Sequence, residues 1–195
     1  RGVDVISLGL SSTDMLYFAS GYLDSPGAIF TASHNPSEYN GIKFCRAAAG
    51  PIGKETGLFE IRNRIDSGVS QPAVRKGSVH EKNILDAFVS HVLGFVDSKA
   101  LLPLHVVADV ANGMGGLVVP AVFEHLPVRL DLMFGELDGT FPNHPADPLN
   151  PENLVDLQKR VELVHADIGL AFDGDADRVF LIDELGQSLS GSTTT

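Results

Sequence analysis

Three carboxylates alternate with small residues directly after the apolar run 168–172. If this stretch were straight, a rise of about 3.3 Å per residue would place the outer two carboxylates roughly 13 Å apart, too far to share one ion. The backbone must therefore curl, and the two small residues between the acids allow it. Since a hard cation prefers clustered oxygens, the spacing predicts a Mg²⁺ site. The predicted ligands are Asp173, Asp175 and Asp177, separated by Gly174 and Ala176.

A solvated acidic loop is the simplest alternative to a metal site. Three carboxylates repel one another unless a cation or Arg178 neutralises them, which favours the metal site. A helix-loop-helix calcium site also has Asp at positions one, three and five, and Glu184 falls on position twelve. Its sixth position must be Gly, however, and here it is Arg178. Residues 179–183 read as a second strand, so we expect a hairpin rather than an exiting helix.

A serine and a histidine form a second polar constellation. Ser33 and His34 follow the apolar run 27–31, and Pro36 breaks the segment, which indicates a loop at a strand end. Adjacent residues in an extended chain point to opposite faces, so His34 is poorly placed to act as a base for Ser33. The Gly-x-Ser-x-Gly turn of serine hydrolases is also missing from the sequence. We therefore expect a serine chemistry other than that of a hydrolase triad.

The composition indicates a globular protein of one large or two small domains. The chain has 195 residues, of which 44% are hydrophobic, enough to bury substantial cores. Asp and Glu outnumber Lys and Arg by 25 to 14, which argues against nucleic acid or an anionic membrane as the main partner. Cys45 is the single cysteine, so we expect no internal disulfide and a cytoplasmic location. The sequence shows neither a membrane span nor a secretion signal.

Strands and helices alternate along the chain, which predicts an α/β fold of two layered domains with mixed, largely parallel sheets. Residues 67–78 are rich in small and polar residues and read as a linker, so we place the domains at 1–76 and 77–195. Function in such sheets gathers at the carboxyl ends of strands, where the aspartates lie. We expect strands at 3–8, 27–31, 42–45, 105–109, 128–133 and 168–172, and helices at 13–20, 54–65, 81–96, 117–125 and 151–165.

Two further loops resemble ligand-binding segments, and we assign both to structure. Residues 111–116 are glycine-rich and lie between a strand and a helix, but their spacing misses the dinucleotide fingerprint and no Lys-Ser/Thr pair follows. A plain strand-to-helix turn explains them better. Residues 139–148 contain three prolines and predict a long ordered loop. His144 in this loop is expected to be structural rather than catalytic.

Two motifs together identify a family. The strings Thr-Ala-Ser-His-Asn-Pro at 31–36 and Tyr-Asn-Gly-Ile-Lys-Phe at 39–44, with the aspartate loop at 173–178, resemble the α-D-phosphohexomutases, the phosphoglucomutase and phosphomannomutase family. The resemblance extends along nearly the whole chain. It includes residues 141–144 and 151–154, which look like a loop and a helix start of the family's second domain.

The resemblance implies roles for the residues of both motifs. Ser33 would be a phosphoserine that exchanges its phosphoryl group with a hexose phosphate through a hexose 1,6-bisphosphate, so that phosphate moves between O1 and O6. The three aspartates would bind one Mg²⁺ together with a phosphoserine oxygen. His34, Lys43 and Arg178 would lie beside the transferring group.

Physical chemistry agrees with these implied roles. Phosphate monoesters hydrolyse extremely slowly, so a serine phosphate survives in water, and its transfer needs a cation and a group that moves one proton. Lys43 meets the second need only if it is partly neutral. A nearby Mg²⁺ would lower its pKa, so we offer the role of Lys43 as a base as a hypothesis.

The chain departs from the family in length. Its members have four domains, and the resemblance places this chain in the later part of the first domain and in the second. We therefore expect a mutase fragment that does not turn over sugar phosphate by itself and whose exposed sheet edges favour association. A non-catalytic metal-binding regulatory domain and a phosphomonoesterase remain as alternatives. The sequence decides neither the preferred hexose nor the oligomeric state.

Overall fold

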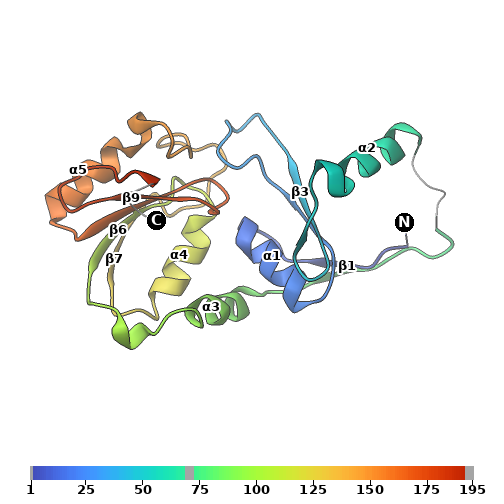
Figure 1. Ribbon diagram of the computed structural model, residues 1–195, viewed down its shortest axis with the longest axis horizontal. Helices are drawn as coiled ribbons and strands as arrows, with labels where there is room; N and C mark the ends of the chain where they lie inside the picture. Colours follow the sequence, from blue (N-terminus) through green and yellow to red (C-terminus); the bar gives the residue numbers. More distant parts are fainter. Residues whose placement is uncertain (1, 69–72, 192–195) are drawn as a thin grey trace.

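The structure, a computed structural model, describes residues 2–68 and 73–191 (Figure 1). Its N-terminal region, residues 2–68, holds an antiparallel sheet in the order β2-β3-β4 and the strand β1, which pairs in parallel with β5 from further along the chain. The elements are β1 Val5–Ser7, α1 Thr13–Tyr22, β2 Gly27–Phe30, β3 Ile42–Arg46, β4 Gly50–Pro51, a π-helical turn Lys54–Leu58, α2 Phe59–Asp66 and β5 Val79–Glu81.

The C-terminal region, residues 85–191, is built on a four-stranded sheet in the order β7-β6-β8-β9. The first three strands are parallel and β9 is antiparallel to β8, which confirms the α/β class with mixed sheets. The elements are α3 Leu85–Leu93, a 3₁₀ turn Ser98–Ala100, β6 His105–Asp109, α4 Gly115–Phe123, β7 Arg129–Met133, a 3₁₀ turn Pro151–Leu154, α5 Val155–Val164, β8 Ile168–Phe172 and β9 Val179–Ile182.

Two apolar cores lie on opposite faces of this sheet because successive side chains of β6 point to opposite sides. Val107 is fully buried against α5, whereas Ala108 is fully buried on the other side. The core on the side of Ala108 also contains Met15 and Ala19 of α1, together with residues of α3 and α4. Helix α1 therefore ties the N-terminal region to the C-terminal sheet, as Figure 1 shows, and it fixes how the two candidate loops meet.

Several predicted elements differ from the observed ones. The predicted helix 54–65 is wrong in its first part, where the π-helical turn ends in a kink at Gly57, whose φ is 146°. The predicted helix 81–96 begins only at Leu85, because residues 79–81 pair with β1 instead. That pairing joins segments on both sides of residue 76, where we predicted the boundary between the two domains. The position of the domain boundary stays a prediction. Residues 69–72 of the predicted linker lie outside the described residues.

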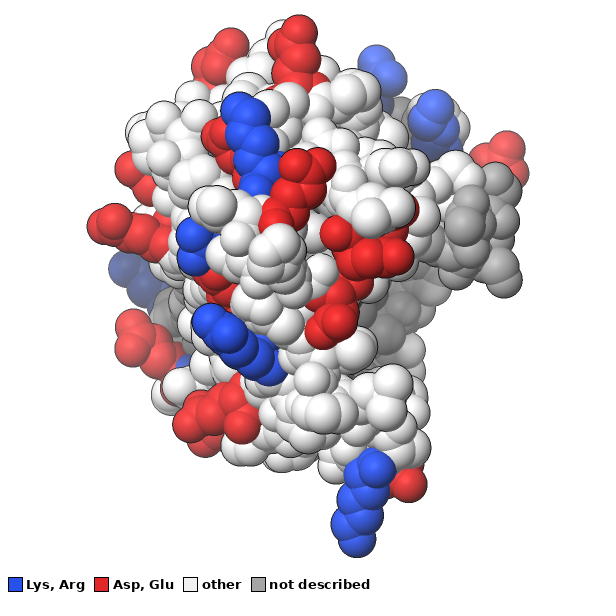
Figure 2. Space-filling model, turned by 90° about the vertical axis from the view of Figure 1, so that its left-hand side faces the viewer, with Lys and Arg blue, Asp and Glu red and all other residues white. Residues whose placement is uncertain are grey.

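Charged side chains of both signs are interspersed over the face shown in Figure 2. Within residues 2–68 and 73–191, the helices are too short or too polar to cross a bilayer. The cytoplasmic location and the exclusion of nucleic-acid and membrane partners stay predictions. So does association through exposed sheet residues, such as Val5 and Val79, which are 47% and 69% exposed.

His144 anchors the long loop that the prolines predict. Its Nε2 lies 3.0 Å from Oδ2 of the buried Asp109, and its Nδ1 lies 2.9 Å from the carbonyl oxygen of Pro145. Since both partners are acceptors, both ring nitrogens donate only when the imidazole is protonated. The hydrogen bond to Asp109 is the main cause that raises the pKa of His144 above 6.5, although burial opposes it. These contacts agree with a structural role.

We expect the stabilising effect of His144 to depend on pH. Because folding raises its pKa, the stabilisation is fully present below about pH 6.5 and is lost as the pH rises through the higher pKa of the folded state. The variant His144→Gln should lose about 1–3 kcal/mol in urea unfolding at about pH 5.5, and less at about pH 9. The exposed His125→Gln serves as a control. An equal loss at both pH values would contradict the assignment.

Candidate active site

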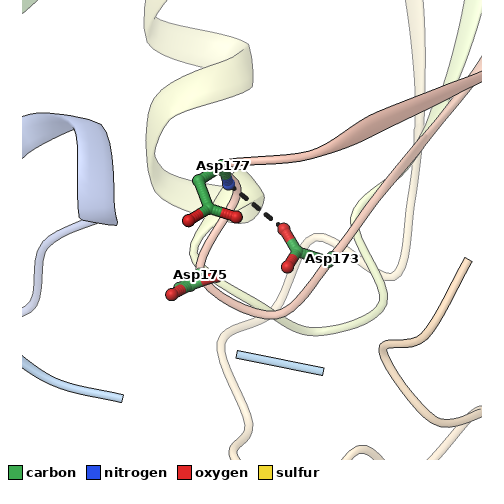
Figure 3. A group of neighbouring side chains, drawn as sticks. All are labelled: Asp173, Asp175 and Asp177. Atoms are coloured by element: carbon green, nitrogen blue, oxygen red, sulfur yellow. Dashed lines mark hydrogen bonds between the residues drawn. The ribbon is translucent and has the colours of Figure 1, made fainter. Parts of the chain in front are cut away.

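The aspartate loop folds as a tight hairpin between β8 and β9. The backbone N–H of Asp173 donates to the carbonyl of Arg178 at 3.2 Å, and that of Ala176 donates to the carbonyl of Asp173 at 3.1 Å. Ala176 adopts the left-handed conformation with a φ of 58°. This curl brings one oxygen from each of the three aspartates within 4.8 Å of one another (Figure 3). The sequence had required such a curl for a shared ion.

The Ser33 loop meets the aspartate loop although more than 130 residues separate them. The hydroxyl of Ser33 donates to Oδ2 of Asp173 at 2.8 Å. Nη2 of Arg178 donates to Oγ of Ser33 at 2.7 Å and to Nδ1 of His34 at 2.6 Å. Ser33 has a φ of 56°, an uncommon conformation for a non-glycine residue and one that clusters at functional sites. Arg178 therefore links the serine, the histidine and the aspartate loop.

Asp173 is fully buried and hydrogen-bonded through both oxygens. Its Oδ1 accepts the backbone N–H groups of Asp177, drawn as the dashed line in Figure 3, and of Arg178, each at 3.1 Å. Its Oδ2 accepts Nε and Nη2 of Arg178 at 2.9 and 2.6 Å. Burial raises the pKa of Asp173, while the hydrogen bonds from Ser33 and Arg178 oppose this rise. Arg178 thus neutralises one side of the acidic loop.

Lys43 neutralises the other side. Its Nζ lies 2.6 Å from Oδ2 of Asp175 and 2.7 Å from Oδ2 of Asp177. Burial by itself would raise the pKa of Asp175, but the hydrogen bonds from Lys43 and Thr13 lower it to about 2. For Lys43, burial acts in the other direction and would lower the pKa, but the hydrogen bonds to its two carboxylate partners raise the pKa overall. In this arrangement Lys43 therefore does not have the lowered pKa that a base needs. Its pKa can fall only if Lys43 moves away from these two carboxylates.

The donor set fits a divalent cation. Among the described residues, the three carboxylates pair with two cationic side chains, Lys43 and Arg178, which leaves a net negative charge in the loop. Oδ1 of Asp175 is buried and has no hydrogen-bond partner among the described residues. A buried, unpartnered carboxylate oxygen is costly unless a cation completes it. Asp173, Asp175 and Asp177 can therefore hold a hard cation such as Mg²⁺.

All the site residues expected from the sequence converge in one place, and their roles stay predictions. Sequence reasoning missed three neighbours of the acidic loop. The hydroxyls of Thr13 and Thr31 donate to Oδ2 of Asp175 at 2.7 and 3.0 Å. Asp14 has a raised pKa, because of burial and then of the nearby charges of Asp177 and Asp175. Thr31 stands in the serine motif, so its position was a signal, but the sequence offers none for Thr13 and Asp14.

Two glycines allow the loops to approach closely. A Cβ on Gly174 would lie 2.3 Å from the carbonyl oxygen of Ser33, and a Cβ on Gly113 would lie 2.6 Å from the carbonyl oxygen of Gly174. The backbone N–H of Met114 also donates to that carbonyl of Gly174 at 2.9 Å. The glycine-rich turn after β6 thus packs against the backbone of the aspartate loop, which agrees with the structural role predicted for this turn.

The variant Gly174→Ala should force the Ser33 loop away from the aspartates. Because backbone atoms crowd the added methyl group, we expect a loss of about 1–3 kcal/mol in the free energy of unfolding, measured in urea. Gly139→Ala is the matched control, since a Cβ there has no neighbour within 4 Å, and its effect should stay within about 0.5 kcal/mol. Equal stability of the two variants would show that the loops do not approach as described.

Two protein-family models match the chain. Residues 1–71 match "Phosphoglucomutase/phosphomannomutase, alpha/beta/alpha domain I", and residues 86–186, more than half of the chain, match domain II of the same description. A phosphomannomutase of Salmonella typhimurium strain LT2 is 41% identical over 198 residues. A protein named "Phosphohexose mutases" from Xanthomonas campestris pv. campestris is 39% identical over 191 residues.

A solved structure has the same fold. The X-ray structure of a phosphoglucomutase/phosphomannomutase family protein from Burkholderia thailandensis matches with a TM-score of 0.83 at 32% identity. The match covers 96% of this chain and 42% of that chain. The Salmonella and Xanthomonas matches each cover 97% of this chain and 43% of the relative. The chain therefore spans less than half the length of these three proteins.

Proposed function

This chain belongs to the phosphoglucomutase/phosphomannomutase family, and we propose that it carries the phosphoserine and metal centre of an enzyme that interconverts hexose 1-phosphate and hexose 6-phosphate. The observation that supports this most is the meeting of the two loops. The Ser33 hydroxyl lies 2.8 Å from Asp173 and 2.7 Å from Arg178. A hydroxyl placed between a carboxylate and a guanidinium suits phosphoryl transfer, in which negative charge must be neutralised.

Ser33 is the proposed phosphoryl carrier. When a hexose 1,6-bisphosphate meets the unmodified enzyme, a bond forms between Oγ of Ser33 and phosphorus, and the bond from that phosphorus to the sugar oxygen breaks. The proton of the Ser33 hydroxyl passes through Lys43 to that sugar oxygen, which leaves as a hydroxyl of a hexose monophosphate. In the reverse step a sugar hydroxyl attacks the phosphorus of the phosphoserine and gives its proton to Lys43. The bond between phosphorus and Oγ of Ser33 breaks, and a proton from Lys43 restores the Ser33 hydroxyl. Arg178 pairs with the phosphoryl oxygens, and His34 lies beside them through its hydrogen bond to Arg178.

The three aspartates are the proposed ligands of one Mg²⁺, joined by an oxygen of the phosphorylated Ser33. A cation held there supplies positive charge to the transferring phosphoryl group. The open oxygen of Asp175 and the net negative charge of the loop support this assignment. Lys43 must then give up at least part of its contact with Asp175 and Asp177, which frees it to take the sugar proton.

The proposed substrates are the phosphates of mannose and glucose. The names of the Salmonella, Escherichia coli and Vibrio cholerae relatives, all phosphomannomutases, support mannose. We also propose that the 195-residue chain by itself does not interconvert these sugars, since it spans 43% of the length of the relatives.

The test is intact-mass analysis of the longest natural protein that contains this chain, incubated with Mg²⁺ and glucose 1,6-bisphosphate. We expect a phosphoprotein that carries one added phosphoryl group, release of hexose monophosphate, and then conversion of mannose 1-phosphate to mannose 6-phosphate. Release of inorganic phosphate without an isomer would indicate a phosphomonoesterase instead. Metal binding without any phosphoprotein would indicate a non-catalytic metal-binding domain.

A further inference from the structure

We infer that Thr13 and Thr31 are positioning residues, which hold Asp175 by one carboxylate oxygen so that its other oxygen faces the cation. The inference rests on the proposed metal centre and adds to it the groups that orient one ligand. It concerns two side chains that belong to the N-terminal region, whereas Asp175 belongs to the C-terminal region.

The two oxygens of Asp175 have opposite surroundings. Oδ2 accepts three hydrogen bonds, from Thr13 Oγ1 at 2.7 Å, from Thr31 Oγ1 at 3.0 Å and from Lys43 Nζ at 2.6 Å. Two of these three donors, the threonine hydroxyls, do not depend on Lys43 and remain on Oδ2 when Lys43 gives up its contact. Oδ1 is buried and accepts no hydrogen bond from the described residues. Oδ1 is therefore the oxygen of Asp175 that is left for a cation.

Each threonine hydroxyl also accepts a hydrogen bond, and this leaves its proton to be donated to Asp175. Thr31 Oγ1 accepts the backbone N–H of Ser33 at 2.9 Å, and Thr13 Oγ1 accepts from Lys43 Nζ at 3.2 Å. Each hydroxyl proton is thus free to point at Asp175, which as a carboxylate can only accept. Thr31 therefore connects the backbone of the phosphoryl carrier to a metal ligand through a single oxygen atom.

The threonines sit on rigid elements. Thr13 begins α1, where Ser12 caps the helix by accepting the N–H of Met15 at 3.2 Å, and the N–H of Thr13 itself donates to the carbonyl of Asp175 at 3.1 Å. Thr31 directly follows β2, and its N–H donates to the carbonyl of Gly41 at 3.0 Å. Lys43 has a flexible stem and a side chain that is 31% exposed, so it fixes the carboxylate less firmly.

Loss of either hydroxyl should weaken cation binding because Asp175 then turns more freely. Hydrogen bonds that orient a metal ligand typically contribute 10- to 100-fold in affinity, so we expect Thr13→Val and Thr31→Val each to raise the dissociation constant by about 10-fold or more. Thr13→Ser and Thr31→Ser keep the hydroxyl and should restore binding to within about 3-fold of the original protein.

The experiment measures Mn²⁺ and Mg²⁺ binding to the longest natural protein that contains this chain by isothermal titration calorimetry, with the electron spin resonance of free Mn²⁺ as a second readout. Thr140→Val is the matched control, because Thr140 donates to Asp138 at 2.7 Å in a loop that contributes none of the three aspartates. Circular dichroism melting without metal reports on folding. A merely structural threonine would lower the melting temperature without changing the affinity of the folded chain, and the serine variants would rescue only stability.

The outcomes separate the two proposals. Weaker binding in the valine variants, with rescue by serine and no change in Thr140→Val, supports the inference. Unchanged affinity in Thr13→Val and Thr31→Val, with binding abolished in Asp175→Asn, overturns the inference and leaves the metal centre intact. If the original protein binds neither Mn²⁺ nor Mg²⁺, the metal centre in the proposed function is wrong, and the positioning role is overturned with it.

Discussion

Replacing Ser33 with alanine is expected to abolish phosphoryl uptake from glucose 1,6-bisphosphate, together with mutase turnover. The reason is that Oγ of Ser33 is the only atom of this residue that can carry the phosphoryl group, and it lies between Asp173 and Arg178, which would neutralise and orient it. The measurement is intact-mass analysis, in Mg²⁺, of the longest natural protein that contains this chain, combined with a coupled assay of hexose 6-phosphate formation. We expect both signals to fall to background.

The matched control for Ser33→Ala is Ser37→Ala. Ser37 lies four residues further along the same loop and is exposed, so the substitution tests whether any change in the loop suffices. It should take up one phosphoryl group and turn over normally. Ser33→Ala should also bind Mg²⁺ with little change, because the three aspartates remain. A Ser33→Ala protein that still gains one phosphoryl group would show that another residue is the carrier.

Replacing Lys43 with methionine is expected to slow phosphoryl transfer to the sugar by about 10²- to 10⁴-fold, the usual contribution of a general acid or base. Without a cation, Lys43 is held by Asp175 and Asp177, which raise its pKa. The proposed role as a base needs a lowered pKa instead. We expect the pKa of Lys43 to fall when a cation takes the place of its ammonium group between the two carboxylates. The measurement is the turnover number of the longest natural protein that contains this chain, with mannose 1-phosphate at saturating Mg²⁺, which separates proton transfer from metal affinity.

Lys43→Arg tells the proton-transfer role from simple charge neutralisation. Arginine keeps the positive charge beside the carboxylates but does not lose its proton, so it should be as inactive as methionine if Lys43 is the base. Activity recovered in Lys43→Arg would mean that only the charge matters. The exposed Lys54→Met is the control for loss of a lysine elsewhere. Near-normal turnover in Lys43→Met would exclude a base role for Lys43.

The strands that flank the aspartate loop and the curl of that loop were predictable from the sequence because both depend on local patterns. Strands β6 and β8 occupy the predicted residues, 105–109 and 168–172, since each contains an apolar run, 106–108 in β6 and 168–172 in β8, that is followed by an aspartate. The alternation of acids with Gly174 and Ala176 predicted the curl, and Ala176 indeed adopts a positive φ. A run of adjacent residues carries all the information that such a hairpin needs.

Pairings between distant segments were not predictable, because no local pattern names the partner. Glu81 was predicted to begin a helix, yet residues 79–81 pair with residues 5–7, and the hydrogen bonds of that pairing outweigh helical propensity. The sequence indicated neither the π-helical turn at Lys54–Leu58 nor the short strand β4. Both depend on where neighbouring elements lie.

The sequence by itself determined which groups we propose for the chemistry: a hydroxyl at Ser33, three alternating carboxylates and the cationic side chains near them. Only the tertiary structure decided how they are oriented. Helix α1 packs into the core beside β6, and this places Thr13 against Asp175, 162 residues away. Burial of apolar surface drives that packing without regard to position along the chain. The contact of Thr13 with Oδ2 of Asp175, which leaves Oδ1 without a hydrogen bond from the described residues, therefore forms only once the chain is folded.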